Sequence, residues 1–190
     1  KVYSFDNQLA FSQGIREEID IETVKSLIIG CVSVTKTDIE QDKKGIDYIA
    51  RLRNGAEIYI DAKSRNKGCG KYWRSGPELA LEKWSVLPGG HYNIPLEEAK
   101  VGWTLCEAKN THLILFTFDP SDSLEVFLVS FQLLRIAFRR NLVHWYQIYK
   151  TDRQKSKQDK RRGESECVFV PVGLVDEATN PASRGIINKT

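Results

Sequence analysis

Residues 57–65 combine acidic and basic side chains in a pattern typical of a β-strand. They read Glu-Ile-Tyr-Ile-Asp-Ala-Lys-Ser-Arg, so apolar and polar residues alternate. Successive side chains of a strand point to opposite faces, which puts both isoleucines and Ala62 on one face. Asp61 and Lys63 then share the other face, about 7 Å apart along the strand. The pattern predicts an apolar face that packs against helices and, behind it, a carboxylate next to an ammonium group.

A second carboxylate, Asp47, lies near the start of the preceding predicted strand, residues 45–52. The intervening residues 53–55 (Arg-Asn-Gly) are the clearest hairpin signal in the sequence. A three-residue loop with its glycine in the left-handed conformation places Asp47 opposite Asp61, with Cβ atoms about 5 Å apart. A two-residue Asn-Gly turn would instead pair Asp47 with Ala62 and separate the carboxylates. A site that uses both carboxylates therefore requires the three-residue loop.

Two carboxylates at this separation repel each other unless a cation lies between them. Mg²⁺ prefers oxygen ligands and typically takes one or two carboxylates together with waters and phosphate oxygens. A neighbouring lysine such as Lys63 can orient or deprotonate an attacking water and stabilise charge that develops on a phosphate. These residue types therefore indicate metal-dependent hydrolysis of a phosphodiester, with Mg²⁺ as cofactor and Mn²⁺ as a substitute.

Asp47, the hairpin and Asp61-Ala62-Lys63 resemble the PD-(D/E)XK nuclease superfamily, in particular its small resolvase-like and phage-type members. The resemblance covers roughly residues 8–65 at the level of motifs. The residue before Asp47 is Ile46, where the family motif has proline. The resemblance implies an α/β fold with a restriction-endonuclease-like core, in which a mixed sheet is flanked by helices in the order α-β-β-β-α-β.

The resemblance also implies roles for individual residues. Asp47, Asp61 and the backbone carbonyl of Ala62 would bind the metal, and Lys63 would orient the water. A glutamate on the first helix often completes such a site. Glu18 is our candidate for it, with Glu17 next.

These motifs predict a metal-dependent deoxyribonuclease that hydrolyses DNA phosphodiester bonds. One alternative is a catalytically inactive DNA-binding or regulatory protein on the same scaffold, and a weaker one is a protein-interaction module. Asp-x-Lys or Glu-x-Lys also occurs at residues 42–44, 98–100 and 107–109, so the motif at 61–63 could instead be a solvated ion pair. Only residues 61–63 combine an alternating strand with another aspartate on the paired strand, which favours the enzyme.

Two basic segments are candidates for DNA contact. Residues 65–74 mix glycines with basic and aromatic side chains, which could stack on a base, although the aromatics could equally belong to a core. Residues 150–162 hold seven basic and two acidic residues in a chain whose net charge is only +3, and are otherwise a solvated loop. The candidate DNA-binding residues are Arg65, Lys67, Lys71, Trp73, Arg74, Lys155, Lys157, Lys160, Arg161 and Arg162.

Patterns along the rest of the chain predict a single domain, residues 1–190. Apolar residues at steps of three or four make residues 131–149 the best helix. The segment 78–87 is ambiguous between strand and helix. The remaining expectations are helices at 6–29 and 96–108, strands at 31–35, 112–118, 125–130 and 167–174, loops at 36–44, 66–76 and 150–166, and a loose tail from about 176.

Composition narrows the class of protein further. With 41% hydrophobic and 28% charged residues, the chain is neither disordered nor collagen-like. Its apolar runs are too short to span a membrane, and no leader-like pattern of basic, apolar and small residues opens it, so we do not expect secretion. The four cysteines lie far apart without a Cys-x-x-Cys pair, which argues against a disulfide framework or a zinc ribbon. We expect a cytoplasmic protein and, by the resemblance, a homodimer if both DNA strands are cut.

Overall fold

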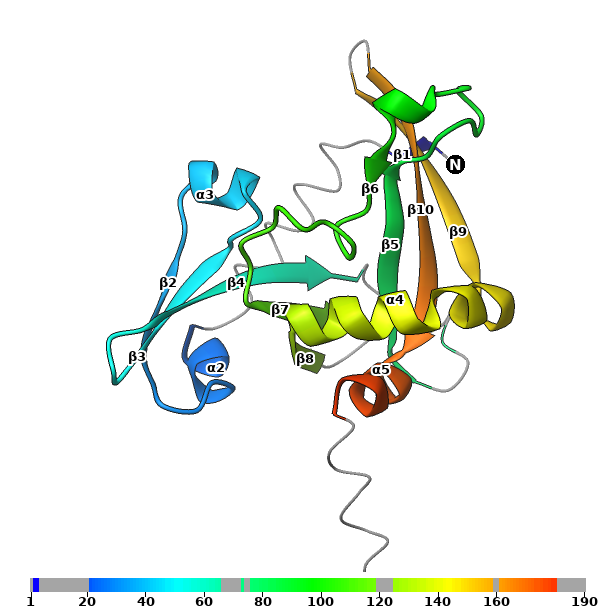
Figure 1. The fold of residues 1–190 in the computed structure, drawn as a ribbon. Coiled ribbons are helices and arrows are strands. Elements are labelled where there is room, and N and C mark those ends of the chain that lie inside the picture. The colour runs from blue at the N-terminus through cyan, green and yellow to red at the C-terminus, as the bar shows by residue number, and fades with distance from the viewer. Residues whose placement is uncertain are drawn as a thin grey trace, which may run out of the picture. The chain divides into compact units, whose positions relative to one another are not determined.

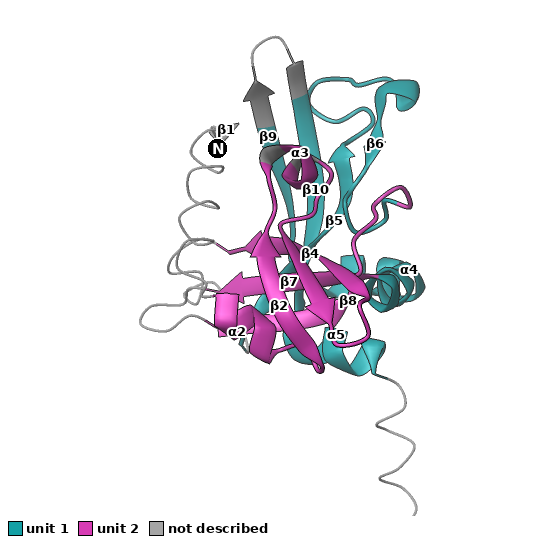
Figure 2. Ribbon diagram, turned by 90° about the vertical axis from the view of Figure 1, so that its left-hand side faces the viewer, with its two compact units in different colours: residues 1–4, 73–106, 132–190 teal, residues 5–72, 107–131 magenta. Residues whose placement is uncertain are grey.

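The computed structural model describes residues 2–3, 21–65, 73, 76–118, 125–158 and 161–180. The chain divides into two compact units, each with a five-stranded sheet (Figure 2). Unit 1 comprises residues 1–4, 73–106 and 132–190, and unit 2 comprises residues 5–72 and 107–131.

The sheet of unit 2 has the strand order β2-β3-β4-β7-β8 (Figure 1). Strands β2, β3 and β4 form an antiparallel meander, β7 pairs parallel with β4, and β8 pairs antiparallel with β7. The sheet is therefore mixed, as the sequence predicts. The elements of this unit are α2 (Ile21–Ser26), β2 (Cys31–Lys36), α3 (Ile39–Lys43), β3 (Tyr48–Leu52), β4 (Glu57–Ser64), β7 (Leu113–Phe118) and β8 (Glu125–Ser130).

The β3–β4 hairpin has the three-residue loop that a two-carboxylate site requires. Tyr48 lies opposite Ile60, and Ile49 lies opposite Tyr59. The amide of Gly55 donates to the carbonyl of Leu52 at 2.9 Å, and Gly55 has a φ of 84°. The left-handed residue closes a turn of the type expected for three-residue hairpin loops. The predicted register is confirmed.

The apolar face of β4 lies in the core of unit 2, as its alternation predicts. Ile60 and Ala62 are buried in a cluster with Val24 of α2 and Tyr48 of β3, and Ile58 packs against it. Full burial of a side chain such as Ile60 contributes about 1.5–3 kcal/mol to folding. This core fixes which face of β4 is left for Asp61 and Lys63.

The sheet of unit 1 has the order β1-β9-β10-β5-β6. It is antiparallel except at its edge, where the two-residue strand β1 pairs parallel with β9. The ambiguous segment 78–87 is a strand, β5, which lies between β10 and β6. The elements of unit 1 are β1 (Val2–Tyr3), β5 (Glu78–Val86), the 3-10 turn η2 (Leu96–Glu98), β6 (Lys100–Val101), β9 (Thr151–Gln158), β10 (Arg161–Pro171) and α5 (Val172–Thr179).

Helix α4 (Phe131–Ile148) matches the predicted helix 131–149 within one residue. Leu134, Phe138 and Trp145 are buried, so the predicted apolar stripe is the face that packs. Among the described residues, none of the helices combines the length and the apolar character that a membrane crossing requires.

The prediction of a loop at residues 150–166 is wrong. Most of this segment forms the antiparallel pair β9–β10, with Arg153 opposite Glu166 and Lys155 opposite Glu164. The Nε of Arg153 donates to Glu166 at 2.9 Å. Opposite charges that face each other across two paired strands stabilise the pair. The two halves of this polar segment can therefore form a hairpin with each other.

The last predicted strand, 167–174, has its boundaries displaced at both ends. Strand β10 begins at Arg161 and ends at Pro171, and α5 follows at once. Proline lacks an amide hydrogen and cannot extend the ladder, while its restricted φ suits the residue that precedes a helix.

Two further expectations are corrected. The predicted helix 96–108 contains only the single turn η2, followed by β6, in which Val101 pairs with Trp84. Valine and glycine at 101–102 are weak helix formers, so pairing with β5 prevails. The predicted loop 36–44 contains the short helix α3, because the side chain of Asp38 caps it by accepting from the amide of Gln41 at 2.9 Å.

The predicted helix 6–29 is represented within the described residues only by α2, which ends at Ser26. Its first part, the tail beyond residue 180 and most of the loop 66–76 lie outside the described residues.

Candidate active site

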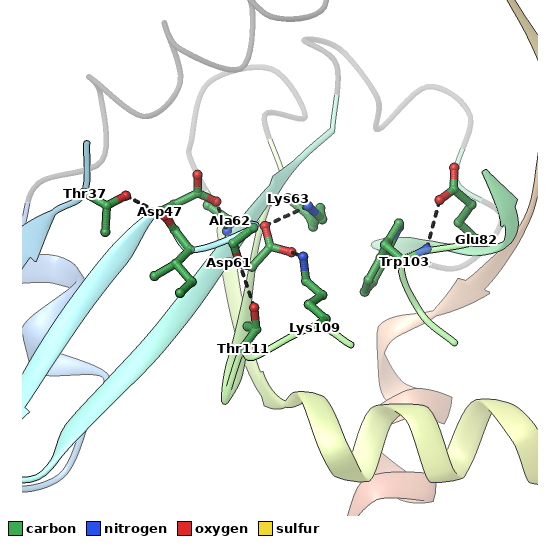
Figure 3. Close-up of polar contacts among 11 residues, drawn as sticks. Thr37, Asp47, Asp61, Ala62, Lys63, Glu82, Trp103, Lys109 and Thr111 are labelled. Carbon is green, nitrogen blue, oxygen red and sulfur yellow. Dashed lines mark hydrogen bonds and ion pairs between the residues drawn. The ribbon is translucent and has the colours of Figure 1, made fainter. Parts of the chain in front are cut away.

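Asp61 lies on β4 and is almost completely buried, with 1% of its surface exposed. The ammonium group of Lys63 donates to its Oδ1 at 2.7 Å. The ammonium group of Lys109 lies 2.8 Å from its Oδ2 (Figure 3). One carboxylate is therefore held between two cations, one on each oxygen.

Asp47 is the residue before β3 and is 5% exposed. Its Oδ2 accepts a hydrogen bond of 2.6 Å from the backbone amide of Ala62. Its own amide donates to the carbonyl of Ile60 at 2.8 Å. The carboxylate of Asp47 therefore lies beside the Asp61–Ala62 peptide, and the hairpin brings Asp47, Asp61, Ala62 and Lys63 into one place.

Two threonines hold the segment that leads to Asp47. The amide of Thr37 donates to the carbonyl of Asp47 at 3.0 Å, and its hydroxyl donates to the carbonyl of Ile46. The hydroxyl of Thr111 donates to the carbonyl of Gly45 at 2.8 Å. Thr37 follows β2 and Thr111 precedes β7, so the backbone of residues 45–47 is held by segments next to two other strands of the same sheet (Figure 3).

Sequence reasoning missed Lys109 as a site residue. Residues 107–109 read Glu-Ala-Lys, one of the repeated Glu-x-Lys matches that no alternating strand supports. The available signal was position, because Lys109 lies just ahead of β7, the strand that pairs parallel with β4. Sequence alone does not say that β4 and β7 are neighbours.

Lys109 also lies close to Gly45. A Cβ built on Gly45 would overlap the Nζ of Lys109, and Gly45 has a φ of 77°. Both the close approach and the left-handed backbone favour glycine there. A side chain at Gly45 would therefore compete for space with the cation on Asp61.

The electrostatics of Asp61 combine two opposing effects. Burial raises the pKa of its carboxyl, whereas the positive charges of Lys63 and Lys109 lower it, and the net pKa lies below the ordinary value of 3.8. Asp61 is thus a charged carboxylate at neutral pH. Together with Asp47, the two acidic and two basic side chains balance in formal charge.

The chemistry of the donor set fits a hard divalent cation. Two buried carboxylates and the carbonyl of Ala62 can supply oxygen ligands, and an ion that binds Asp61 would share its oxygens with the ammonium groups of Lys63 and Lys109. Across the described ranges, no cluster of three or more His, Cys, Asp or Glu side chains forms a metal site. Any ion bound here would therefore rely on two carboxylates and take further oxygens from water, phosphate or residues outside those ranges.

The remaining predicted site residues are distributed over both units. Glu17, Glu18, Lys67, Lys71, Arg74 and Lys160 lie outside the described residues. Arg65 directly follows β4, and its amide donates to the carbonyl of Thr117 at 2.9 Å, so it continues the strand that carries Asp61. Trp73, Lys155, Lys157, Arg161 and Arg162 belong to unit 1, the last four on β9 and β10.

Comparison of the chain with protein-family models, with curated proteins and with solved structures finds no match in any of the three.

Proposed function

We propose that the protein is a divalent-metal-dependent deoxyribonuclease that hydrolyses DNA phosphodiester bonds. The observation that carries the proposal is the bond from the amide of Ala62 to Asp47, which places Asp47 beside the residue pair Asp61 and Lys63. A buried acidic pair with an adjacent lysine is the combination that metal-assisted phosphodiester hydrolysis needs.

The topology of unit 2 supports a restriction-endonuclease-like core. Helix α2, the antiparallel strands β2, β3 and β4, and the parallel strand β7 match the first helix and the four strands of the order that the PD-(D/E)XK resemblance implies. The crossover from β4 to β7 departs from that order, because residues 78–101 contribute β5 and β6 to unit 1. We include this core in the proposal, with an insertion in place of a simple crossover helix.

Asp47, Asp61 and the carbonyl of Ala62 would hold Mg²⁺ or, as a substitute, Mn²⁺. A bound divalent ion supplies Lewis-acid stabilisation of the phosphate and a more acidic water. The bond from the Ala62 amide orients Asp47, and the two lysines keep Asp61 ionised. The protein therefore presents charged, oriented oxygen ligands before any ion arrives.

Lys63 is the residue we assign to the attacking water. Its side chain is 32% exposed while its ammonium group remains on Asp61. It can therefore donate a hydrogen bond to a water or to a phosphate oxygen without losing contact with the carboxylate. Such a donor stabilises the negative charge that builds up as the phosphodiester is attacked.

DNA would be bound by basic residues in both units. Arg65 extends from the strand of Asp61, and Lys155 lies on β9 among the basic residues of the β9–β10 hairpin. Contacts of this kind neutralise phosphates, so binding should weaken as salt rises.

A second candidate is an inactive DNA-binding or regulatory protein on the same scaffold. It is favoured by the occupation of both Asp61 oxygens by ammonium groups, which a purely structural ion-pair network would also show. The two candidates differ in whether a divalent ion binds and whether DNA is cleaved.

The test is a cleavage assay on duplex, single-stranded and branched DNA with Mg²⁺, Mn²⁺ or a chelator. We expect cleavage with either metal, none with chelator, and losses of at least a hundredfold for Asp61→Asn and Lys63→Ala. Glu57→Gln is the matched control, since Glu57 lies on the same strand in an exposed pair with Arg51 and should retain full activity. Absence of metal-dependent cleavage on all three substrates would favour the inactive alternative.

A further inference from the structure

Two lysines bind the same carboxylate but differ in their surroundings. Lys63 and Lys109 contact Asp61 at 2.7 and 2.8 Å, yet their side chains are 32% and 10% exposed. Lys63 can serve a ligand at the surface of the site. Lys109 is more deeply buried and less accessible to such a ligand, so we infer that the two cations have different roles.

Lys109 lies close to the backbone of the turn before β3. Its Nζ occupies the space that a Cβ on Gly45 would take, so a side chain at this position would have to displace the ammonium group. The carbonyl of Gly45 is in turn held by the hydroxyl of Thr111, two residues after Lys109. The ammonium group is thus built into the same turn that leads to Asp47.

We propose that Lys109 is a positioning residue, the internal counter-cation of Asp61, and that it sets the metal affinity of the site. Without metal it holds the buried carboxylate charged and in place. A divalent ion that binds Asp61 competes with Lys109 for the same oxygens, so the lysine lowers affinity while it preserves the site. The statement about metal affinity rests on the proposed function, whereas the statement about the counter-cation does not.

The first arm of the test measures stability without metal, by urea unfolding in the presence of a chelator. Lys109→Gln leaves a buried carboxylate with a single cation, which is strongly destabilising. We expect its urea midpoint to fall at least twice as far as that of Lys63→Gln. Arg51→Gln is the control, because it removes a cation from the exposed Arg51–Glu57 pair of the same sheet and should change the midpoint little. A Lys109→Gln midpoint no lower than that of Arg51→Gln overturns the proposal.

A double variant separates charge from packing. Asp61→Asn combined with Lys109→Gln removes both charges together, so it should be more stable than Lys109→Gln alone. This comparison remains decisive if Lys109→Gln itself fails to fold. A double variant that is no more stable than the single one would attribute the effect to packing and contradict the counter-cation role.

The second arm measures Mn²⁺ and Mg²⁺ binding by calorimetry without DNA. We expect at least threefold tighter binding for Lys109→Gln, wild-type affinity for Lys109→Arg, and no binding for Asp61→Asn. Equal or weaker binding by Lys109→Gln rules out competition. If the wild type binds neither ion, the metal role and the proposed function fail together, while the stability arm still decides whether Lys109 is the counter-cation.

Discussion

Asp61 is a buried charge in the middle of a strand, and such a charge is tolerated only when it is paired. The neighbouring residues that point to the other face of β4 are apolar and buried in a cluster. The positive charge that offsets Asp61 must therefore come from its own side of the strand. Lys63 does this from two residues away, and Lys109 does it from the connection that precedes β7. The ion pair between Asp61 and Lys63 is local in sequence. The ion pair between Asp61 and Lys109 exists only because β4 and β7 are adjacent.

The lowered pKa of Asp61 predicts an acid-dependent loss of stability. Because the folded-state pKa lies below the unfolded value near 3.8, the charged form stabilises the protein above that pH, and this contribution is lost as the pH falls through the folded-state pKa. Asp61→Asn lacks the titrating group. We expect the difference in unfolding free energy between wild type and Asp61→Asn to be constant from pH 7 to pH 5 and to shift against the wild type below about pH 4. Urea unfolding across this range measures it, and a difference that does not change with pH contradicts the assignment.

Asp47 has a structural and an electrostatic role that two substitutions separate. Asp47→Ala leaves the buried amide of Ala62 without its acceptor and should lower the unfolding free energy by about 1–3 kcal/mol. Asp47→Asn retains a carbonyl oxygen that can accept this bond, so it should be more stable than the alanine variant. If the proposed function holds, it should still lose the metal binding of the wild type. Urea unfolding and calorimetry provide the two readouts. Equal stability of the two variants would show that the bond contributes little.

At the scale of elements, the turn before β3 and the loop after it both depend on left-handed glycines. Gly45 and Gly55 have φ values of 77° and 84°. Only Gly45 is crowded, because nothing lies within 4 Å of a Cβ built on Gly55. The two positions therefore form a matched pair for testing the contact with Lys109.

Alanine at either glycine should cost about 1–2 kcal/mol for the left-handed backbone. Gly45→Ala should cost more than Gly55→Ala, because its methyl group must also displace Lys109 from Asp61. Thermal or urea unfolding of both variants measures the difference. Equal losses would indicate that Lys109 adjusts without weakening its ion pair.

The β9–β10 hairpin is a second element whose role can be tested directly. If Lys155 contacts a phosphate, Lys155→Gln should reduce the slope of log K against log salt by about 0.9 on duplex DNA. Lys25→Gln on α2, which removes a cation paired with Glu22, is the control and should leave the slope unchanged. Fluorescence anisotropy between low and moderate salt measures both variants. An unchanged slope for Lys155→Gln would place this residue outside the DNA contact.

At the scale of the whole molecule, the two units are interwoven along the chain. In unit 2, β4 pairs with β7 although residues 73–106 between them belong to unit 1. In unit 1, β5 pairs with β10 although residues 107–131 between them belong to unit 2. Each sheet therefore pairs strands that are connected through residues of the other unit. When one sheet unfolds, the connection between paired strands of the other sheet becomes a long unfolded segment.

This connectivity predicts a single cooperative unfolding transition. All four tryptophans, residues 73, 84, 103 and 145, belong to unit 1, so their fluorescence follows the unfolding of that unit. Ile60→Ala, in the core of unit 2, should cost about 2–5 kcal/mol. We expect it to shift the fluorescence midpoint as far as the midpoint by circular dichroism. A fluorescence transition that stays at the wild-type midpoint would show that the units unfold separately.

The sequence by itself determined much of the strand pattern of unit 2 and the part of the candidate site that the β3–β4 hairpin carries. Alternation along residues 57–65 predicted both faces of β4, and Arg-Asn-Gly at residues 53–55 is compatible with the register that aligns Asp47 with Asp61. The helix 131–149 was predictable because its apolar periodicity is long and regular, and the strand 125–130 because it is a short apolar run that follows a turn signal. These features are local, so short-range pattern and turn chemistry are sufficient for them.

Only the tertiary structure decided the features that depend on distant pairing. The charged segment 150–166 becomes strands because Arg153 and Glu166 meet across a hairpin, and residues 100–101 become a strand because β5 lies beside them. Lys109 joins the site because the parallel pairing of β4 with β7 brings a residue 48 positions further along the chain onto Asp61. Pairing partners are chosen by the packing of the whole sheet, and no local pattern contains that information.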